Sequence, residues 1–521
     1  MKQTFIMKKN YFLILFLFTQ TILFAQNFSW LQVPAINLTV NPSMISYPSA
    51  TDNQGNTFVC GYKDTPFLYN RVQSNLLLSK YNSSGTLLFS KTLTGDLHAH
   101  KLITDSTGNV YLALNFLTNI SIENFNLESE LFVENPLLIK FNANGDFIWH
   151  KTLAGEFTNH FAAMAIDTNQ NLYIGYDDYN NSHIEKIDKN TGETLQSIEQ
   201  NGVKIISSVS IDNEGNIYAA GSCAEINATF NGTALPAPHL YNIYITKYNP
   251  NGQMQWTKYI EDITCPSPIV KARTPNEVYF SSELFDSFPF DAIIPEGPTS
   301  GYSDFFLAKL NQTGNFTWVK EVPGMGSVTP GMTNSLEIDN DGNIYFGGNT
   351  RNTVQWNETI STTANEFSYD ILVLKYNPSG NVVWAKTAGG NSHDQLHSIS
   401  LLPDGNLVVT GIAKENTTFE PLNHNPTNAN YYPFVTRLNQ STLDLPESEI
   451  KPLIVYPNPA KQTITVQSNY LNGVATLHNP LGQLLKTVTI TSNETTFDIS
   501  ELSKGTYFFK LNSDVINIIK E

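Results

Sequence analysis

Hydrophobic and polar positions alternate in short runs along this chain, and one phrase of this kind recurs seven times. Its clearest copy, Ile338 to Gly348, reads IDNDGNIYFGG, a polar turn followed by alternating β-branched and aromatic residues. Gly and Asn tolerate positive φ and Asp can bond its own backbone, so each copy predicts a tight turn that leads into a strand. The turn positions, 45 to 66 residues apart, are Gly55, Gly108, Gln170, Gly215, Asn276, Gly342 and Gly405.

A partner phrase follows each copy and predicts a second strand pair. In the sixth unit it reads Lys375-Tyr376-Asn377, then Gly380 and Trp384. The copies begin at Lys80, Lys140, Lys186, Lys247, Lys309, Lys375 and Arg437. Each unit is therefore strand, turn, strand, long excursion, strand, turn, strand. Self-similarity at this period with four antiparallel strands per unit is typical of a β-propeller blade.

The seventh unit lacks an aromatic strand after Arg437, and the beginning of the chain supplies one. The segment Asn27 to Trp30 matches Asp146 to Trp149 in register. We therefore expect the N-terminal strand to complete the last blade and close the ring, which removes free sheet edges. The periodic Trp residues are expected to pack between blades.

The repeat resembles a bacterial β-propeller repeat family with an Asp-x-x-Gly-Asn-x-Tyr-x-x-Gly signature, over residues 27–443. Two copies depart from it, at Gln170 and Asn276. The resemblance implies an all-β fold with seven blades, assigned here to residues 26–443.

The N-terminal residues 1–25 have the pattern of a secretory signal peptide. Lys8 and Lys9 precede an apolar run over residues 11–24, and the predicted cleavage lies between Ala25 and Gln26. A membrane anchor is the alternative, but the run is short for a transmembrane helix. We expect an exported chain without a stable transmembrane span.

A different pattern begins after a polar linker at residues 444–452. Alternating strands over residues 453–521 predict a small β-sandwich of about seven strands. This segment resembles the type A C-terminal sorting domain of the type IX secretion system. The residues that carry the resemblance are Tyr456, Pro457, Asn458, Pro459, Gly482, Gly505 and Tyr507. It implies the type IX machinery as a partner, passage through the outer membrane and removal of this domain, followed by release or attachment to the cell surface.

Composition narrows the possible partners. The formal net charge is −17 with only 15% charged residues, which opposes binding of nucleic acid through its phosphates. Of three cysteines, Cys60 is expected to be a buried small hydrophobe. Cys223 and Cys265 lie in neighbouring units and could pair in an oxidising compartment.

Few residues stand out as candidate sites. Trp356 is out of register with the repeat and is a candidate contact for a sugar ring. His100 and His397 are predicted to start inner strands near the ring axis, where they could hold a ligand or a metal, or could simply be core or solvated histidines. The Asp339 turn resembles a calcium loop, but Thr350 stands where the bidentate Glu would be. No catalytic, cofactor-binding or metal-binding residue is predicted.

These patterns favour a secreted or cell-surface propeller that is not an enzyme and binds a protein or a polysaccharide, because loops on a rigid scaffold carry recognition. One alternative is a polysaccharide lyase or hydrolase with its site over the channel. Another is a structural adhesin or scaffold. An aromatic groove would favour glycan binding, and clustered carboxylates or a metal at the channel mouth would favour the enzyme.

Overall fold

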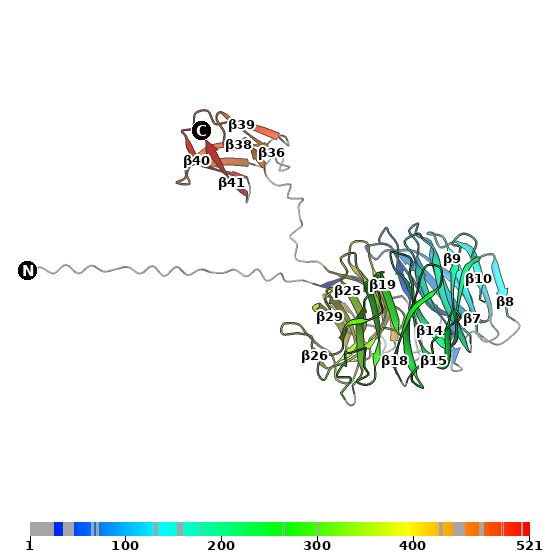
Figure 1. Ribbon diagram of the computed structural model, residues 1–521. Coiled ribbons are helices and arrows are strands. Elements are labelled where there is room, and N and C mark those ends of the chain that lie inside the picture. The colour runs from blue at the N-terminus through cyan, green and yellow to red at the C-terminus, as the bar shows by residue number, and fades with distance from the viewer. Residues whose placement is uncertain are drawn as a thin grey trace, which may run out of the picture. The chain divides into compact units, whose positions relative to one another are not determined.

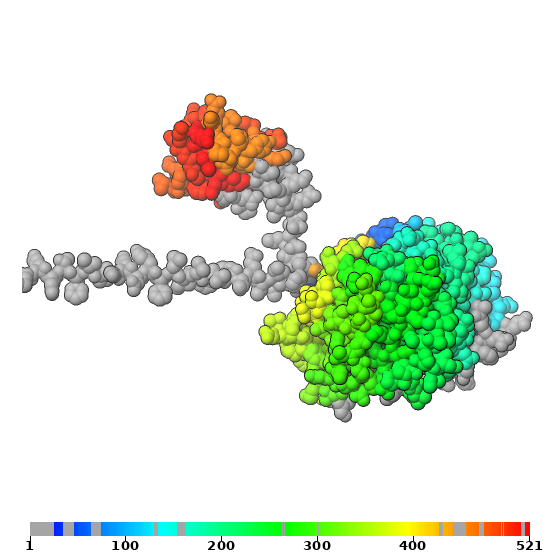
Figure 2. All heavy atoms as spheres, viewed as in Figure 1, coloured from blue at the N-terminus to red at the C-terminus, as the bar shows by residue number. Residues whose placement is uncertain are grey.

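The chain forms two compact domains, Met1–Thr442 and Leu443–Glu521, in a computed structural model (Figures 1 and 2). The structure describes residues 26–34, 46–63, 67–68, 72–129, 134–153, 160–178, 180–262, 264, 266–299, 302–426, 431–440, 454–467, 474–490, 492, 494–511 and 514–521. Every regular element in these ranges is a strand. The predicted signal peptide, with Ala25, and the linker at residues 444–452 lie outside the described residues, so these boundaries stay predictions.

Strand pairing divides the first domain into antiparallel sets of four. The first blade is β2 (Ser49–Thr51), β3 (Thr57–Tyr62), β5 (Val72–Tyr81) and the first half of β6 (Leu87–Thr104); the second is the rest of β6, β7 (Val110–Ile122), β9 (Asn135–Phe141) and β10 (Phe147–Thr152). The third is β11 (His160–Ile166), β12 (Leu172–Asp177), β13 (Asn181–Ile187) and the first half of β14 (Thr194–Ile211); the fourth is the rest of β14, β15 (Ile217–Phe230), β17 (Asn242–Tyr248) and β18 (Met254–Glu261).

The remaining sets complete the ring. The fifth blade is β19 (Ile269–Thr274), β20 (Glu277–Leu284), β21 (Asp304–Leu310) and β22 (Phe316–Lys320). The sixth is β24 (Leu336–Ile338), β25 (Ile344–Arg351), β28 (Asp370–Tyr376) and β29 (Val382–Gly390), and the seventh is β30 (Gln395–Leu401), β31 (Leu407–Lys414), β34 (Tyr431–Asn439) and β1 (Asn27–Gln32). The propeller fold is confirmed, and the count of seven in the described residues is our interpretation of these pairings.

Short additional strands lie in the long connections. They are β4 (Phe67–Leu68), β8 (Phe125–Glu128), β16 (Thr233–Ala234), β23 (Ser327–Pro330), β26 (Thr353–Gln355), β27 (Ser361–Thr363), β32 (Thr417–Phe419) and β33 (Leu422–His424). The two tight turns of a blade lie at one end of its strands, and the long connections lie at the other end, because the four strands are antiparallel. We call these two ends the turn face and the loop face.

The N-terminal strand closes the ring as expected. β1 pairs with β34 through Phe28 opposite Leu438 and Trp30 opposite Arg437. The seventh blade is in turn bonded to the first, since Thr51 Oγ1 donates to the carbonyl of Leu401 at 2.6 Å. Loop-closure entropy grows only slowly with chain length, so this distant pairing costs little more than a nearer one.

Indole rings join successive blades at the turn face. The Trp256 Nε1 donates to the carbonyl of Gln312 in the next blade at 3.1 Å. Its ring lies where a side chain at Gly314 would be, 2.6 Å from an added Cβ, and Gly314 has φ +80°, so only glycine fits there. Trp30 and Trp149 donate in the same way to Ser83 and Lys189. The expected packing role of these Trp residues is therefore observed.

The C-terminal domain is a two-sheet sandwich, as predicted. One sheet contains β35 (Ile454–Tyr456), β36 (Thr463–Gln467) and β39 (Glu494–Asp498); the other contains β38 (Leu484–Thr489), β37 (Val474–His478), β40 (Gly505–Leu511) and β41 (Asp514–Lys520). Ile464, Val466, Phe497 and Phe509 fill the space between the sheets. None of the described residues forms a helix long and apolar enough to cross a membrane.

Candidate functional site

The aspartates of the turn face are occupied by their own turns. The carboxylate of Asp212 accepts hydrogen bonds from Glu214 N at 2.9 Å, Asn216 N at 3.0 Å and the Tyr218 hydroxyl at 2.9 Å. Asp339 makes the same contacts in the sixth blade. Burial alone would raise the pKa of Asp339, but the hydrogen bonds from Asn343 and the turn outweigh it and lower that pKa. A carboxylate held ionised in this way is a poor proton donor.

The inner strands of all seven blades enclose an axial channel with a volume of about 420 Å³. Five charged side chains line it, namely Lys101, Lys271, Arg273 and Glu337 from these strands and Asp339 from the turn after β24. Lys271 Nζ lies 3.1 Å from Glu337 Oε2, and Arg273 is held by Glu277 at 2.7 Å. Two of the three cations in the channel are therefore already neutralised.

Lys101 is the third cation, and it has no such partner. Its Nζ donates to the carbonyl of Thr333 at 2.8 Å, and no carboxylate among the described residues lies within ion-pair distance. Burial, helped by the charge of Lys271 and opposed by that of Glu337, lowers the pKa of Lys101 to about 7. The sequence analysis missed this residue; the available signal was a lysine in an inner strand, four residues before the Asp105 turn.

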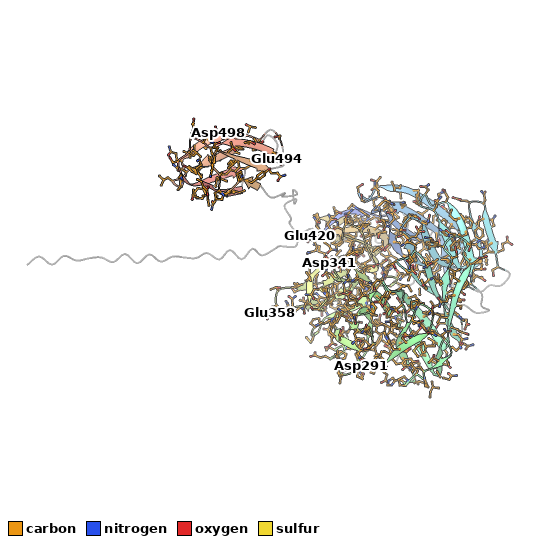
Figure 3. The ribbon with its side chains drawn as sticks, turned by 45° about the horizontal axis from the view of Figure 1, so that its top comes forward. Asp291, Asp341, Glu358, Glu420, Glu494 and Asp498 are labelled. Carbon is orange, nitrogen blue, oxygen red and sulfur yellow. The ribbon has the colours of Figure 1, made fainter. Side chains whose placement is uncertain are left out.

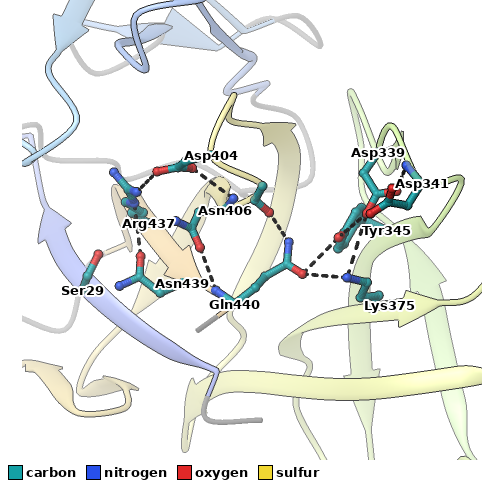
Figure 4. A pocket seen from close by; sticks show the side chains of 11 residues that line it. Ser29, Asp339, Asp341, Tyr345, Lys375, Asp404, Asn406, Arg437, Asn439 and Gln440 are labelled. Carbon is teal, nitrogen blue, oxygen red and sulfur yellow. Dashed lines mark hydrogen bonds and ion pairs between the residues drawn. The ribbon is translucent and has the colours of Figure 1, made fainter. Parts of the chain in front are cut away.

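A second cavity of about 530 Å³ lies at the seam between the sixth and seventh blades (Figure 4). Lys309 of the fifth blade donates to a backbone carbonyl of the next blade, that of Pro378. At the seam, Lys375 Nζ instead donates to the side chain of Gln440 at 3.1 Å, and Arg437 pairs with Asp404. These side chains are used in closing the ring, so we assign the seam a structural role.

The loop face differs because it exposes large apolar side chains. They lie on the connections of the fourth, fifth and sixth blades and are 37–85% exposed: Ile226, Leu240, Tyr241, Phe285, Ile294, Met325, Met332 and Phe367. Phe285 and Met332 also line a cavity of about 330 Å³. Acidic side chains such as Asp291 and Glu358 stand at the surface of the same domain (Figure 3).

Three buried carboxylates lie at the loop ends of the fifth to seventh blades. Burial raises the pKa of Asp304, Asp370 and Asp394 to about 7 in each case. Backbone N–H groups bond Asp304 and Asp394 without offsetting the loss of water. Within the residues described, no group of three His, Cys, Asp or Glu side chains could hold a metal ion.

The structure does not bring the three predicted ligand residues together, and a role of any one of them in binding stays a prediction. Trp356 is 7% exposed, packs in the core of the sixth blade and donates from Nε1 to Thr362 Oγ1 at 2.9 Å, which favours packing over sugar contact. His397 is fully buried, and burial lowers its pKa to about 3. The rings of His98 and His100 lie 4.5 Å apart. The first blade separates His100 from His397, and neither lines the channel.

The cysteines partly follow expectation. Cys60 is free and fully buried, as predicted. Cys223 is disulfide-bonded. Cys265 lies outside the described residues, so its pairing with Cys223 stays a prediction.

The sorting-motif residues tie the start of the C-terminal domain to its last strand. Asn458 Nδ2 donates to Asn517 O at 2.6 Å and its Oδ1 accepts from Ile519 N at 2.8 Å. Tyr507 donates from its hydroxyl to Ser503 O at 2.8 Å. The other motif residues are Tyr456, Pro457 and Pro459 near β35, Gly482 in the β37–β38 turn and Gly505 at the start of β40. The motif therefore helps to build the sandwich.

Comparison with known families identifies this second domain. Residues 454–521 match the family described as the secretion system C-terminal sorting domain. The type IX sorting assignment made from Tyr456 to Tyr507 is thereby confirmed, and with it export to the cell surface or the medium.

The propeller has only distant relatives among those found. An uncharacterized WD repeat-containing protein of Acanthamoeba polyphaga mimivirus is 23% identical over 366 residues, which cover 54% of this chain and 26% of that protein. The chain thus matches about a quarter of that relative's length.

Solved structures similar to this chain include several propellers. The Dos1 propeller is 8% identical with a TM-score of 0.42 and covers 80% of this chain and 95% of its own. A streptogramin B lyase is 12% identical with a TM-score of 0.39, and the match covers 79% of this chain and 98% of the lyase chain. PorZ, a surface component of the type IX secretion system of Porphyromonas gingivalis, is 9% identical with a TM-score of 0.26. The match covers 91% of this chain and 70% of the PorZ chain.

Proposed function

We propose that this exported propeller is not an enzyme and that it binds a protein partner through the loop face of its fourth to sixth blades. The observation that carries the proposal is the set of eight exposed apolar side chains on those connections, among them Leu240 at 85% and Phe367 at 84% exposure. Large apolar side chains gathered on one face of a soluble protein mark interaction surfaces.

The chemistry of this surface favours a protein over a polysaccharide. Five of the eight side chains are Ile, Leu or Met, which pack against apolar protein surfaces. Binding of sugar rings would instead use several exposed Trp or Tyr faces, whereas Tyr241 is the single such side chain in this set and Trp356 is buried. An adhesin or scaffold without a specific partner would leave these apolar groups in water without a use.

The carboxylates argue against the enzyme alternative. On the turn face, Asp105 and Asp339 have lowered pKa values and accept hydrogen bonds from their own turns. Acid catalysis needs a proton donor with a raised pKa next to a base in an open site. The raised carboxylates Asp304, Asp370 and Asp394 are instead nearly covered at the loop ends of the strands.

A binding screen of the purified exported chain against surface proteins and glycans, with turnover monitored in the same wells, tests this proposal. The double variant L240D/F367D should lose protein binding at least tenfold, because two charges replace exposed apolar contacts. The control L195D/I148D changes two apolar residues that are about half exposed, on the outer strands of the second and third blades, and should bind as the wild type does. Binding unaffected by L240D/F367D, or turnover of a glycan, would contradict the proposal.

The export route can be tested separately. A chain that ends at residue 452 should accumulate in the periplasm, because the sandwich that the sorting machinery takes as its signal is missing. Fractionation of cells and medium measures this, with the full-length chain as the control. Normal amounts of the shortened chain at the surface or in the medium would show that export does not depend on this domain.

A further inference from the structure

We propose that the axial channel is a binding site for a small hydroxylated carboxylate, the chemical class of the sugar acids. The site is formed by Lys101 of β6, Lys271 of β19, and Asn334 and Glu337 of the sixth blade. It is separate from the loop-face surface and does not depend on it.

Lys101 is the channel cation for which the described residues supply no carboxylate within ion-pair distance. Glu337 and Glu277 already pair with Lys271 and Arg273. The remaining carboxylate of the lining, Asp339, faces Lys375 at 3.9 Å, and Lys101 donates to the neutral carbonyl of Thr333. An ammonium group has three donors, so two remain for a ligand. An unpaired cation in a low-dielectric site is costly, and an anion that pairs with it recovers part of that cost.

Asn334 supplies the complementary acceptor. Its Nδ2 donates to Glu337 Oε1 at 2.6 Å and to the carbonyl of Ile399 at 2.7 Å, which fixes the orientation of the amide. Its Oδ1 is buried and has no hydrogen-bond partner among the described residues, and Asn334, at 7% exposure, lines the channel. Buried acceptors are almost always satisfied, and a hydroxyl on the ligand would satisfy this one.

The size and lining of the channel restrict the ligand further. About 420 Å³ lies in the lower part of the range for small-molecule sites. None of the described residues that line it is aromatic, so an apolar ligand has nothing to stack on. Glu337 would repel a second negative charge, which favours a singly charged carboxylate over a phosphate dianion.

Titration of the exported chain with glucuronate, followed by calorimetry, tests the site. K101M keeps the apolar stem and should weaken binding at least tenfold. E337Q removes the opposing charge and releases Lys271, so it should tighten binding several-fold. K63M, at an exposed lysine outside the channel, is the matched control and should bind as the wild type does. Because the two channel variants shift affinity in opposite directions, a loss of folding cannot imitate the expected pair of results.

Further arms define the ligand class. Glucose, which has the hydroxyls without the carboxylate, and inorganic phosphate should both bind at least tenfold more weakly than glucuronate. Binding should weaken as the pH rises from 6 to 8, because Lys101, which is flanked by Lys271, Arg273, Glu337 and Asp339, then loses its proton. If a uronic acid oligomer competes with glucuronate, the natural ligand is the end of a polymer. If the oligomer does not compete, the natural ligand is a free sugar acid. Equal binding of glucose, or K101M that binds like K63M, would overturn the proposal.

Discussion

The turn face and the loop face of the propeller are built from the same strands, yet they use polar groups in opposite ways. On the turn face, Asp212 and Asp339 satisfy their own turns and Trp256 joins the next blade, so the same contacts recur around the ring. On the loop face, connections of unequal length expose Leu240 and Phe367. The turn face therefore holds the ring together, and the loop face is free to vary.

Electrostatics separates the two faces in the same way. Hydrogen bonds overcome burial at Asp105 and Asp339 of the turn face and lower their pKa values. At the loop face, burial dominates and raises the pKa of Asp304 and Asp394 to about 7. The balance between burial, which favours the neutral form, and hydrogen-bond donors, which favour the charged form, decides the direction at each carboxylate.

The largest effect on stability is expected when the strand that closes the ring is removed. Deletion of residues 27–34 removes β1, exposes the edge of β34 and deletes the Trp30 hydrogen bond to Ser83. It also removes Phe28, which is 1% exposed. The melting temperature should fall sharply and the protein should aggregate, because an unpaired edge templates association.

Differential scanning calorimetry and light scattering measure both consequences. S29A, on the exposed side of the same strand, is the control and should melt as the wild type does. A deletion variant that melts like the intact protein would mean that β1 does not close the ring.

A single turn-face carboxylate should have a smaller but clear effect. D212A leaves the Tyr218 hydroxyl and two backbone N–H groups without their acceptor in a buried site. We expect a loss of about 2–4 kcal/mol in the free energy of unfolding, from the cost of unsatisfied buried donors. D286A at the loop face removes one exposed contact to Ser287 N and should change stability by less than about 0.5 kcal/mol. Chemical denaturation measures the free energy of unfolding of both variants. Equal losses would contradict the stated difference between the two faces.

Stability should also depend on pH. The folded pKa of Asp304, Asp370 and Asp394, about 7, lies above the ordinary aspartate value of 3.8, so the folded state binds protons more tightly. Their contribution is fully present below pH 3.8 and is lost as the pH rises to about 7. The melting temperature should therefore fall between pH 5 and pH 8.

Substitution identifies the groups that make the melting temperature depend on pH. The D394N side chain cannot ionise, so this variant should reduce the dependence, whereas E358Q, at the exposed surface (Figure 3), should leave it unchanged. Asp105 and Asp339, with lowered pKa values, act in the opposite direction and lose their contribution only as the pH falls below 3.8. A melting temperature that rises from pH 5 to pH 8 would contradict the assignment of the buried carboxylates.

The sequence by itself determined the features that depend on neighbouring residues. The Asp-x-x-Gly-Asn turns, the alternating strands and the match of Trp30 to Trp149 predicted the propeller and its closure. The motif from Tyr456 to Tyr507 predicted the sorting domain. Turn chemistry and strand alternation act within a few residues, so the linear order carries them.

Only the tertiary structure decided which side chains meet. Lys101 and Glu337 are more than 200 residues apart and line one channel, whereas Trp356 and His397, which stood out in the sequence, are buried in blade cores. The β26–β27 hairpin buries Trp356. The orientation of each blade around the axis determines which side chains of its inner strand face the channel. These outcomes depend on packing between blades that no local pattern encodes, and that is why the channel could not be found from the sequence.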